Sequence, residues 1–149
     1  MSGEKKERLF FQEGAIAPET IASSISHHSK KKNIGAHQIF LGQVREDEKN
    51  GKKIIAIQFD VYDEMAQKEM EKIREEIIVV HKLTCAHIIH SKGMVNTGEI
   101  CFFVFVSSPH RKAATDACSE MVERIKKEVP IFGKEIFEDE THQWKKNKD

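Results

Sequence analysis

Apolar residues recur along this chain in two patterns, one typical of helices and one typical of strands. The clearest helical stripe has apolar residues three or four positions apart, at Ala114, Ala117, Cys118, Met121 and Ile125. Ser108 is a suitable N-cap for this helix, and Pro109 suits its first position because the missing N–H would have no partner there. Pro130 requires the helix to end before it. The stripe therefore predicts an amphipathic helix between Ser108 and Val129.

Two further segments predict helices. Ala66, Met70, Ile73 and Ile77 form a second stripe, which predicts a helix capped by Asp63 and running to about Val79. A shorter helix over Thr20–Ser26 is predicted after Pro18-Glu19. The lysine-rich stretch His27–Asn33 follows it, and its composition is typical of a solvated connection.

Strand patterns occupy most of the remaining chain. Alternating or continuous apolar residues predict strands at Leu9–Ala17, Ile34–Val44, Ile54–Tyr62, Cys85–His90, Ile100–Val106 and 131–137. Lys92-Gly93 and Asn96–Gly98 are typical turns. The polar loop Glu46–Lys53 suggests that the strands on either side of it form a hairpin. Because hairpins alternate with helices, we predict an α+β fold with a mainly antiparallel sheet and packed helices.

Composition limits the classes of function. The 149 residues suit a single domain, with residues 1–8 and 145–149 expected to be flexible. Lysine plus arginine equals aspartate plus glutamate at 24 each, so no overall field favours nucleic acid or a membrane surface. The apolar runs are strand-sized, and the first ten residues lack the apolar segment of a signal peptide. Three cysteines without CxxC spacing fit reduced thiols, so a cytoplasmic location is expected.

Several kinds of site lack support in the sequence. His87 and His90 would point to opposite faces of a strand, and Cys85 with His87 supplies only two ligands, so no metal is predicted. Cys118 lies on the apolar stripe and is interpreted as a packed thiol. The glycine-rich motifs that bind nucleotide phosphates are absent from the sequence. No cofactor is therefore expected.

A set of cations remains, each next to a turn, a helix end or a glycine: Arg45, His110, Arg111, Lys126 and Lys134. Arg45 alone fits either a rim residue or a ligand. His110 and Arg111 lie where a helix start would offer free N–H groups to an anion. Together these cations indicate an anionic small molecule or a carboxylate partner.

Three segments carry a resemblance to a known family. GQVRE (42–46), VSSPHRKAA (106–114) and ERIKKEVPIFGKEIFED (123–139) resemble the large, catalytic subunit of molybdopterin synthase, and the resemblance covers about Ile34 to Trp144. It implies an alpha/beta hammerhead fold and a homodimer within a heterotetramer. The partner would be a small ubiquitin-like sulfur-carrier subunit that ends in a Gly-Gly thiocarboxylate.

The resemblance also implies a reaction and a set of residues. The enzyme would be a sulfurtransferase of molybdenum cofactor biosynthesis, moving two sulfurs onto cyclic pyranopterin monophosphate to form the dithiolene of molybdopterin. Arg45, His110 and Arg111 match substrate-binding positions, and Lys126 matches the principal catalytic lysine. Fixed cations would offset repulsion between the thiocarboxylate and the phosphate, and would stabilise charge as it develops. A lysine can also donate a proton if neighbouring cations lower its pKa.

Two departures from the family pattern leave alternatives open. Gly133 stands where the family has an active-site lysine, and His90-Ser91-Lys92-Gly93 stands where it tends to have His-Arg-x-Gly. Lys134 could occupy the space at Gly133 and act as a second catalytic lysine. Alternatively, the chain could be a catalytically weakened paralogue that binds the carrier tail. A third reading is an unrelated domain that binds phosphate esters.

The length of the last helix bears on how the site is assembled. Arg111 and Lys126 are 15 residues apart, which is about 22 Å along a helix axis. A pterin monophosphate spans on the order of half of that length. We therefore expect each site to combine His110 and Arg111 of one subunit with Arg45 and Lys126 of its twofold mate.

Overall fold

The computed structural model describes residues 9–139 and 141–145 of the chain. Helices and strands alternate in short groups through this part of the sequence. In chain order the elements are β1 (Phe11–Glu13), α1 (Pro18–His28), β2 (Ala36–Gln43), β3 (Glu48–Lys49), β4 (Lys52–Val61), α2 (Asp63–His81), β5 (Cys85–Asn96), β6 (Ile100–Ser108), α3 (Arg111–Glu128), β7 (Ile131–Phe137) and β8 (His142–Trp144). The strands pair in the order β2-β6-β5-β4-β7-β8, antiparallel throughout, and only β1 adds a parallel pair. The predicted α+β fold with a mainly antiparallel sheet is confirmed.

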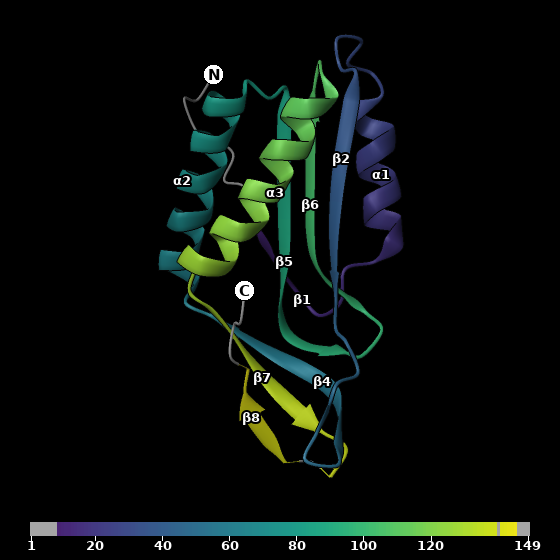
Figure 1. Cartoon of the computed structure of the whole chain (residues 1–149), viewed down its shortest axis with the longest axis vertical. Coiled ribbons are helices and arrows are strands. Elements are labelled where there is room, and N and C mark those ends of the chain that lie inside the picture. The colour runs from purple at the N-terminus through teal and green to yellow at the C-terminus, as the bar shows by residue number, and fades with distance from the viewer. Residues whose placement is uncertain (1–8, 140, 146–149) are drawn as a thin grey trace, which may run out of the picture.

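The long strand β5 joins two parts of the sheet. Its first half pairs with β6 over Cys85–His90, and its second half pairs with β4 over Gly93–Asn96. In Figure 1 the β5-β6-β2 part lies above, and β4, β7 and β8 lie below it at an angle. Gly93 has a φ of 82°, a conformation that glycine adopts without steric cost, and it is the first residue of β5 that pairs with β4. The predicted turn at Lys92-Gly93 is therefore wrong, because the strand changes partner there without ending.

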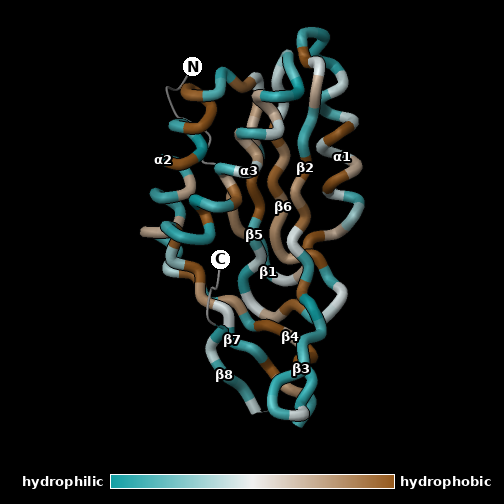
Figure 2. Tube along the Cα trace, viewed as in Figure 1, coloured by the Kyte–Doolittle hydropathy of each residue, from teal (hydrophilic) through white to brown (hydrophobic). Residues whose placement is uncertain are grey.

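The upper sheet, formed by β2, β6 and the first half of β5, packs against a different cluster of apolar residues on each face. Phe102, Val104 and Val106 of β6 belong to the main core, together with the buried stripes of α2 and α3. Phe103 and Phe105 alternate with them and form a smaller cluster with Ile16 and Ile21, on the side of α1. Figure 2 shows the apolar character of these central strands. The helices thus cover both faces of the upper sheet, and α2 and α3 lie side by side in Figure 1.

The buried stripe and the C-terminal end of helix α3 are as predicted, but the helix begins later than predicted, at Arg111. Its stripe from Ala114 to Ile125 is buried, and it ends at Glu128, before Pro130. Ser108 is not its N-cap, because β6 continues through Ser108, which pairs with Ala36 of β2. His110 takes the N-cap position instead, without a side-chain capping bond. Pairing with β2 therefore keeps Ser108 in the strand, although its side chain is of a type that favours a helix N-cap.

The predicted hairpin between Ile34–Val44 and Ile54–Tyr62 is also wrong. Strand β2 pairs with β6, whereas β4 pairs with β5 and β7. The hairpin in this region is the short β3–β4 pair, closed by Asn50 and Gly51 with φ values of 53° and 76°. Two consecutive positive φ values are typical of a tight hairpin turn.

Three smaller boundaries differ from the predictions. Helix α1 extends to His28, which is buried, so the solvated connection begins later than His27. Asp63 lies in the first turn of α2 and not at its cap. The first strand covers only Phe11–Glu13, since it pairs only with three residues of β5.

The expected flexible ends lie mostly outside the described residues, in 1–8 and 146–149. Lys145 is described, and its backbone N–H donates to the Gly133 carbonyl at 2.7 Å. None of the helices in the described part of the chain is long and apolar enough to cross a membrane.

Candidate active site

A large cavity of about 930 Å³ lies where the C-terminal end of α3 approaches β2, β3 and the β7–β8 pair. Five cationic and three acidic side chains contribute to its wall: Arg45, Lys49, Lys126, Lys127 and Lys145, with Asp47, Glu123 and Glu135. A smaller cavity of about 100 Å³ shares Lys126 and Lys145 with it and is also lined by Gly133. The positive excess is therefore local, in a chain whose overall charges balance.

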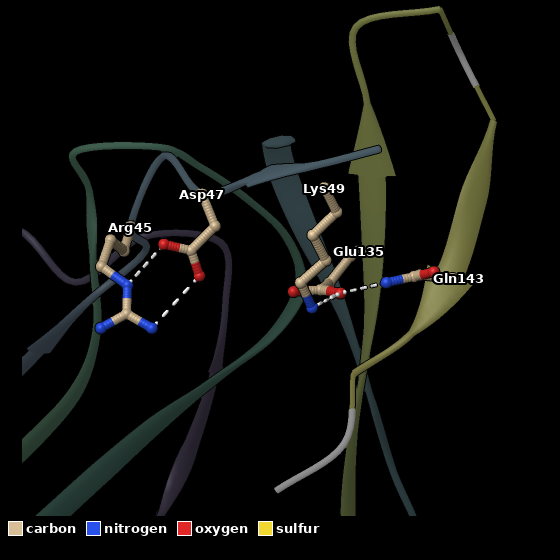
Figure 3. A network of polar contacts seen from close by, with 5 residues as sticks. All are labelled: Arg45, Asp47, Lys49, Glu135 and Gln143. Carbon is tan, nitrogen blue, oxygen red and sulfur yellow. Dashed lines mark hydrogen bonds and ion pairs between the residues drawn. The ribbon is translucent and has the colours of Figure 1, made fainter. Parts of the chain in front are cut away.

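Arg45 is held at the mouth of this cavity by Asp47. Its Nε donates to Asp47 Oδ1 at 2.6 Å and its Nη2 donates to Oδ2 at 3.1 Å, as Figure 3 shows. The guanidinium lowers the pKa of the Asp47 carboxyl below its usual value, mainly through these hydrogen bonds. The Arg45 side chain is nevertheless 79% exposed. It is thus oriented by one carboxylate while much of its surface stays available to another anion.

A buried carboxylate joins three strands at the wall of the cavity. Glu135 of β7 accepts hydrogen bonds from Lys49 Nζ at 2.8 Å and from Gln143 Nε2 at 3.0 Å (Figure 3). Lys49 belongs to β3 and Gln143 to β8. The Glu135 side chain is almost fully buried, so its charge requires such partners. This contact fixes the two short strands around the cavity.

Lys126 and Lys145 line the smaller cavity together with Gly133. Lys126 lies in the last turn of α3, after the buried Ile125, and its side chain is exposed. Lys145 reaches both cavities from the residue after β8. Surrounding protein lowers the pKa of Lys145, and the charge of Lys126 lowers it further. A lysine with a lowered pKa is a better proton donor near neutral pH.

Two buried groups beside these lysines are uncharged at neutral pH. Burial lowers the pKa of His90 to about 4, although its contact with the Ser91 carbonyl opposes the shift. Burial raises the pKa of the Cys101 thiol, although Lys145 and Lys126 oppose this. A protonated thiol is a poor nucleophile. Cys101 therefore does not suit the role of an intermediate sulfur carrier.

The other predicted site residues lie elsewhere. His110 and Arg111 are exposed at the N-terminal end of α3, away from the cavity that Lys126 lines. Lys134 is not part of the wall of either cavity, and its Nζ lies 5.5 Å from the centre of the Trp144 ring. Gly133 and Lys134 are neighbours on a strand, so their side-chain directions are opposite. One chain thus brings together Arg45 and Lys126, but not His110, Arg111 or Lys134.

Sequence reasoning missed Lys145, Lys49 and Glu135. Lys145 lies in a polar tail without periodicity, where the only unusual residue is Trp144. Lys49 and Glu135 are 86 positions apart, so their contact has no local signal.

The family model described as MoaE protein matches residues 12–128 of the chain. The chain belongs to the MoaE family. A curated relative, the molybdopterin synthase catalytic subunit of Pyrococcus abyssi, is 42% identical over 135 residues, which are 91% of this chain and 84% of that protein.

Two solved structures extend the comparison of this MoaE-family chain. The crystal structure of molybdopterin synthase from Staphylococcus aureus matches with a TM-score of 0.82 and 33% identity, covering 97% of this chain and 100% of that one. A complex of subunits 1 and 2 of molybdopterin-converting factor from Helicobacter pylori matches with a TM-score of 0.79 and 23% identity, over 95% and 92% of the two chains. The second comparison supports the fold alone.

Proposed function

We propose that the cation-lined cavity is the place where this chain, as a molybdopterin synthase catalytic subunit, transfers sulfur to a phosphorylated pterin. Family membership and the relatives named above make the chain an enzyme subunit of molybdenum cofactor biosynthesis. The observation that supports the location is the meeting of Arg45, Lys126 and Lys145 at one cavity. The sulfur donor would be the C-terminal thiocarboxylate of a small carrier subunit, and the acceptor cyclic pyranopterin monophosphate.

The charges in the cavity suit this reaction. A thiocarboxylate and a phosphate repel each other, and attack by sulfur moves negative charge onto the pterin. Ammonium and guanidinium groups held in place beforehand stabilise such charge without reorganising at the moment of reaction. Lys126 would stabilise the developing charge, while Lys145, whose pKa is lowered, would supply a proton. Arg45 would hold an anionic group of the substrate at the mouth.

Each active site would be completed by a second copy of the chain. His110 and Arg111 are separated from Lys126 by almost the full length of α3, so one chain cannot direct both ends of this helix to one small substrate. In a twofold dimer the exposed start of α3 from the mate could enter the cavity. Helix-start N–H groups with His110 and Arg111 beside them would then bind the phosphate.

An apolar surface next to the cavity would receive the carrier. Tyr62, Phe132 and Trp144 are exposed and line a shallow depression of about 440 Å³. Trp144 also lines the active-site cavity, so the two surfaces are continuous. Exposed aromatic residues are enriched at protein interfaces. A carrier bound here could extend its C-terminal tail past Trp144 towards Lys126, and two carriers on a central dimer would give a heterotetramer.

A second candidate function is a weakened paralogue that binds the carrier tail without turnover. Only Gly133, which lines the smaller cavity in place of a lysine, favours it. For either function we propose a cytoplasmic location, which the three free buried cysteines support.

Reconstitution with the thiocarboxylated carrier and the pterin precursor tests the proposal, with molybdopterin formed as the readout. We expect the parent to form product, and Lys126→Ala to lose about a hundredfold or more of the rate while keeping carrier binding and the melting temperature. The melting temperature should not change, because the Lys126 side chain is exposed and the neighbouring Ile125 is the residue that packs in the core.

Lys72→Ala, at an exposed lysine of α2, is the matched control and should retain the parent rate. A Lys126→Ala variant with more than half of the parent rate would refute the role assigned to Lys126. Carrier binding without product in the parent itself would instead favour the weakened paralogue.

A further inference from the structure

Three potential metal ligands lie together under α1, on the face of the sheet opposite to α2 and α3. Among residues 9–139 and 141–145, His28, Cys85 and His87 form a group whose ligand atoms all lie within 4.8 Å of one another. His28 comes from the last turn of α1, and the other two alternate along β5. Ala86 and Ile88, their neighbours on β5, face the main core instead. The group is thus separate from the side of the sheet that α3 covers.

The sequence alone offers only two of these ligands. Cys85 and His87 share a face of one strand, but two ligands do not define a site. The third ligand comes from a helix that is 59 positions away from His87 in sequence. The side chains are well enclosed, since His28 is 4% exposed and Cys85 7% exposed.

The hydrogen bonding of His28 prepares it as a ligand. Its Nδ1 lies 2.7 Å from the Ser24 carbonyl oxygen, which can only accept a hydrogen bond. Nδ1 therefore carries the proton, and in the neutral ring the lone pair is on Nε2. That atom is 2.8 Å from His87 Nε2, so the lone pair points to the centre of the group. Metal-binding histidines are typically oriented by such a bond from the second nitrogen to a carbonyl.

The spacing of the ligands suits a small tetrahedral ion. Zinc bonds of about 2.0–2.1 Å to nitrogen and about 2.3 Å to sulfur place two nitrogens roughly 3.3 Å apart, and nitrogen and sulfur roughly 3.6 Å apart. The two imidazole nitrogens, now 2.8 Å apart, would separate by about 0.5 Å on binding. Rotation of the rings provides such a shift without moving the backbone.

Lys31 occupies the remaining side of the sulfur. Its Nζ donates to Cys85 Sγ at 2.7 Å, and its side chain is otherwise exposed. A cation bound at the sulfur would displace the ammonium into solvent, where a long flexible side chain is readily accommodated. The Lys31 contact is therefore a local competitor of the ion.

From this geometry we propose that His28, Cys85 and His87 bind a divalent cation of the zinc class, with a water as fourth ligand. One thiolate and two imidazoles select a metal that accepts sulfur and nitrogen, and not Mg²⁺ or Ca²⁺, which prefer oxygen. On binding, the Cys85 thiol releases its proton to solvent, and the proton on His87 Nε2 moves to Nδ1. The ion would fasten α1 to β5, which also contribute Ile21 and Ile89 to the small cluster around Phe103 and Phe105.

Titration of the metal-free protein with Zn²⁺ against a competing chelator tests this proposal. We expect one equivalent to bind, and a rise in melting temperature when it does. Co²⁺ in its place should give a sulfur-to-metal charge-transfer band and the intense visible bands of a tetrahedral site. Cys85→Ser and His28→Ala should each weaken Zn²⁺ binding by at least about a hundredfold, because loss of a ligand's hydrogen-bond partner alone costs about 10- to 100-fold. Lys31→Ala should bind Zn²⁺ more tightly.

Matched controls keep the outcomes distinct. Cys118→Ser removes a buried thiol outside the group, and His81→Ala removes the histidine at the end of α2, which contacts Glu120 of α3, so both should bind Zn²⁺ like the parent. If a ligand variant does not fold, the Co²⁺ spectrum of the parent protein alone shows whether the metal binds to the Cys85 sulfur. A parent that binds no stoichiometric Zn²⁺, or a Co²⁺ complex without sulfur charge transfer, would overturn the proposal. Neither result bears on sulfur transfer at the Lys126 cavity.

Discussion

Gly133 has no side chain, and lysines from other elements line the smaller cavity beside it. Its position lines the small cavity together with Lys126 and Lys145, and the Lys145 backbone N–H donates to the Gly133 carbonyl. The neighbouring Lys134 is directed towards Trp144 instead. The second ammonium of the proposed site would therefore come from the residue after β8 and not from β7.

Lys145→Ala should lower the rate of sulfur transfer by at least about tenfold, because it removes a charge that faces the reacting groups. Lys134→Ala should have a smaller effect, since its Nζ lies over the Trp144 ring. Both rates would be measured by molybdopterin formation at saturating carrier. The reverse order of effects would assign the second lysine to Lys134, as the sequence pattern suggested.

Gly133→Lys tests whether a lysine on β7 can replace the ammonium group of Lys145. Gly133 does not have a positive φ, and an added Cβ would meet the Ile57 methyl group at 3.1 Å, a contact that needs only a small shift. Introduced into the Lys145→Ala chain, this lysine should restore part of the lost rate.

His90 makes the stability of the fold depend on pH. In the folded chain its pKa is about 4, below the value of 6.5 that is usual for histidine, so the unfolded chain binds a proton more readily between these two pH values. The contribution of His90 to the free energy of unfolding is therefore complete above about pH 6.5. It is lost as the pH decreases towards 4, and the loss reaches up to about 3 kcal/mol. His90→Gln should flatten this dependence in urea unfolding measured across that range.

The control for this experiment is His81→Gln, which changes the last residue of α2, a histidine that contacts Glu120 of α3. If the parent and His90→Gln lose stability in parallel below pH 6.5, the buried imidazole is not the group responsible.

At the scale of elements, periodic segments could be predicted and strand partners could not. The stripe from Ala114 to Ile125 is visible in the sequence because a helix buries one face along its length. The sequence pattern predicts the wrong partner for β2, because the residues of β6 with which it pairs lie 57 to 72 positions further along the chain. The family resemblance proposes Lys126 and Arg45 as site residues, and both line the cavity. His28 and Lys49, in contrast, contact residues 59 and 86 positions away, so no local pattern could predict their surroundings.

The junction between β2 and α3 depends on a close backbone approach at Gly35. A Cβ at Gly35 would lie 2.2 Å from the Pro109 carbonyl oxygen, and Gly35 N–H donates to the Ser108 carbonyl at 3.0 Å. Gly35→Ala should therefore destabilise the protein by about 1–3 kcal/mol in denaturant unfolding, as overpacking does. It should also lower activity, because it displaces His110 and Arg111.

Gly133→Ala is the matched control for Gly35→Ala, since the nearest atom to its added Cβ is a side-chain methyl and not a carbonyl. Equal losses of stability in the two variants would show that the approach at Pro109 is not a special constraint.

At the scale of the whole molecule, the separation of Arg111 from Lys126 along α3 predicts that a dimer is the catalytic unit. Arg111→Ala and Lys126→Ala chains, each inactive alone, should recover activity when mixed. In a mixed dimer one composite site carries both lesions and the other is intact, so activity should approach about half of the parent value per mixed dimer.

Subunit exchange must be demonstrated in that mixture, for example by mass spectrometry of differently tagged chains. Exchanged dimers that remain inactive would rule out the shared site, and one of the two residues would then act outside the cavity.

The surplus of cations at the active-site cavity also has a kinetic consequence. Because the chain as a whole carries no net charge, this field is felt only near the mouth, within a screening length of about 8 Å at physiological ionic strength. In the proposed assembly, an anionic tail would be oriented only in the last step of its approach, after the aromatic surface of Tyr62, Phe132 and Trp144 had bound the body of the carrier. Added salt would therefore slow the threading of the tail more than it loosens the docked carrier.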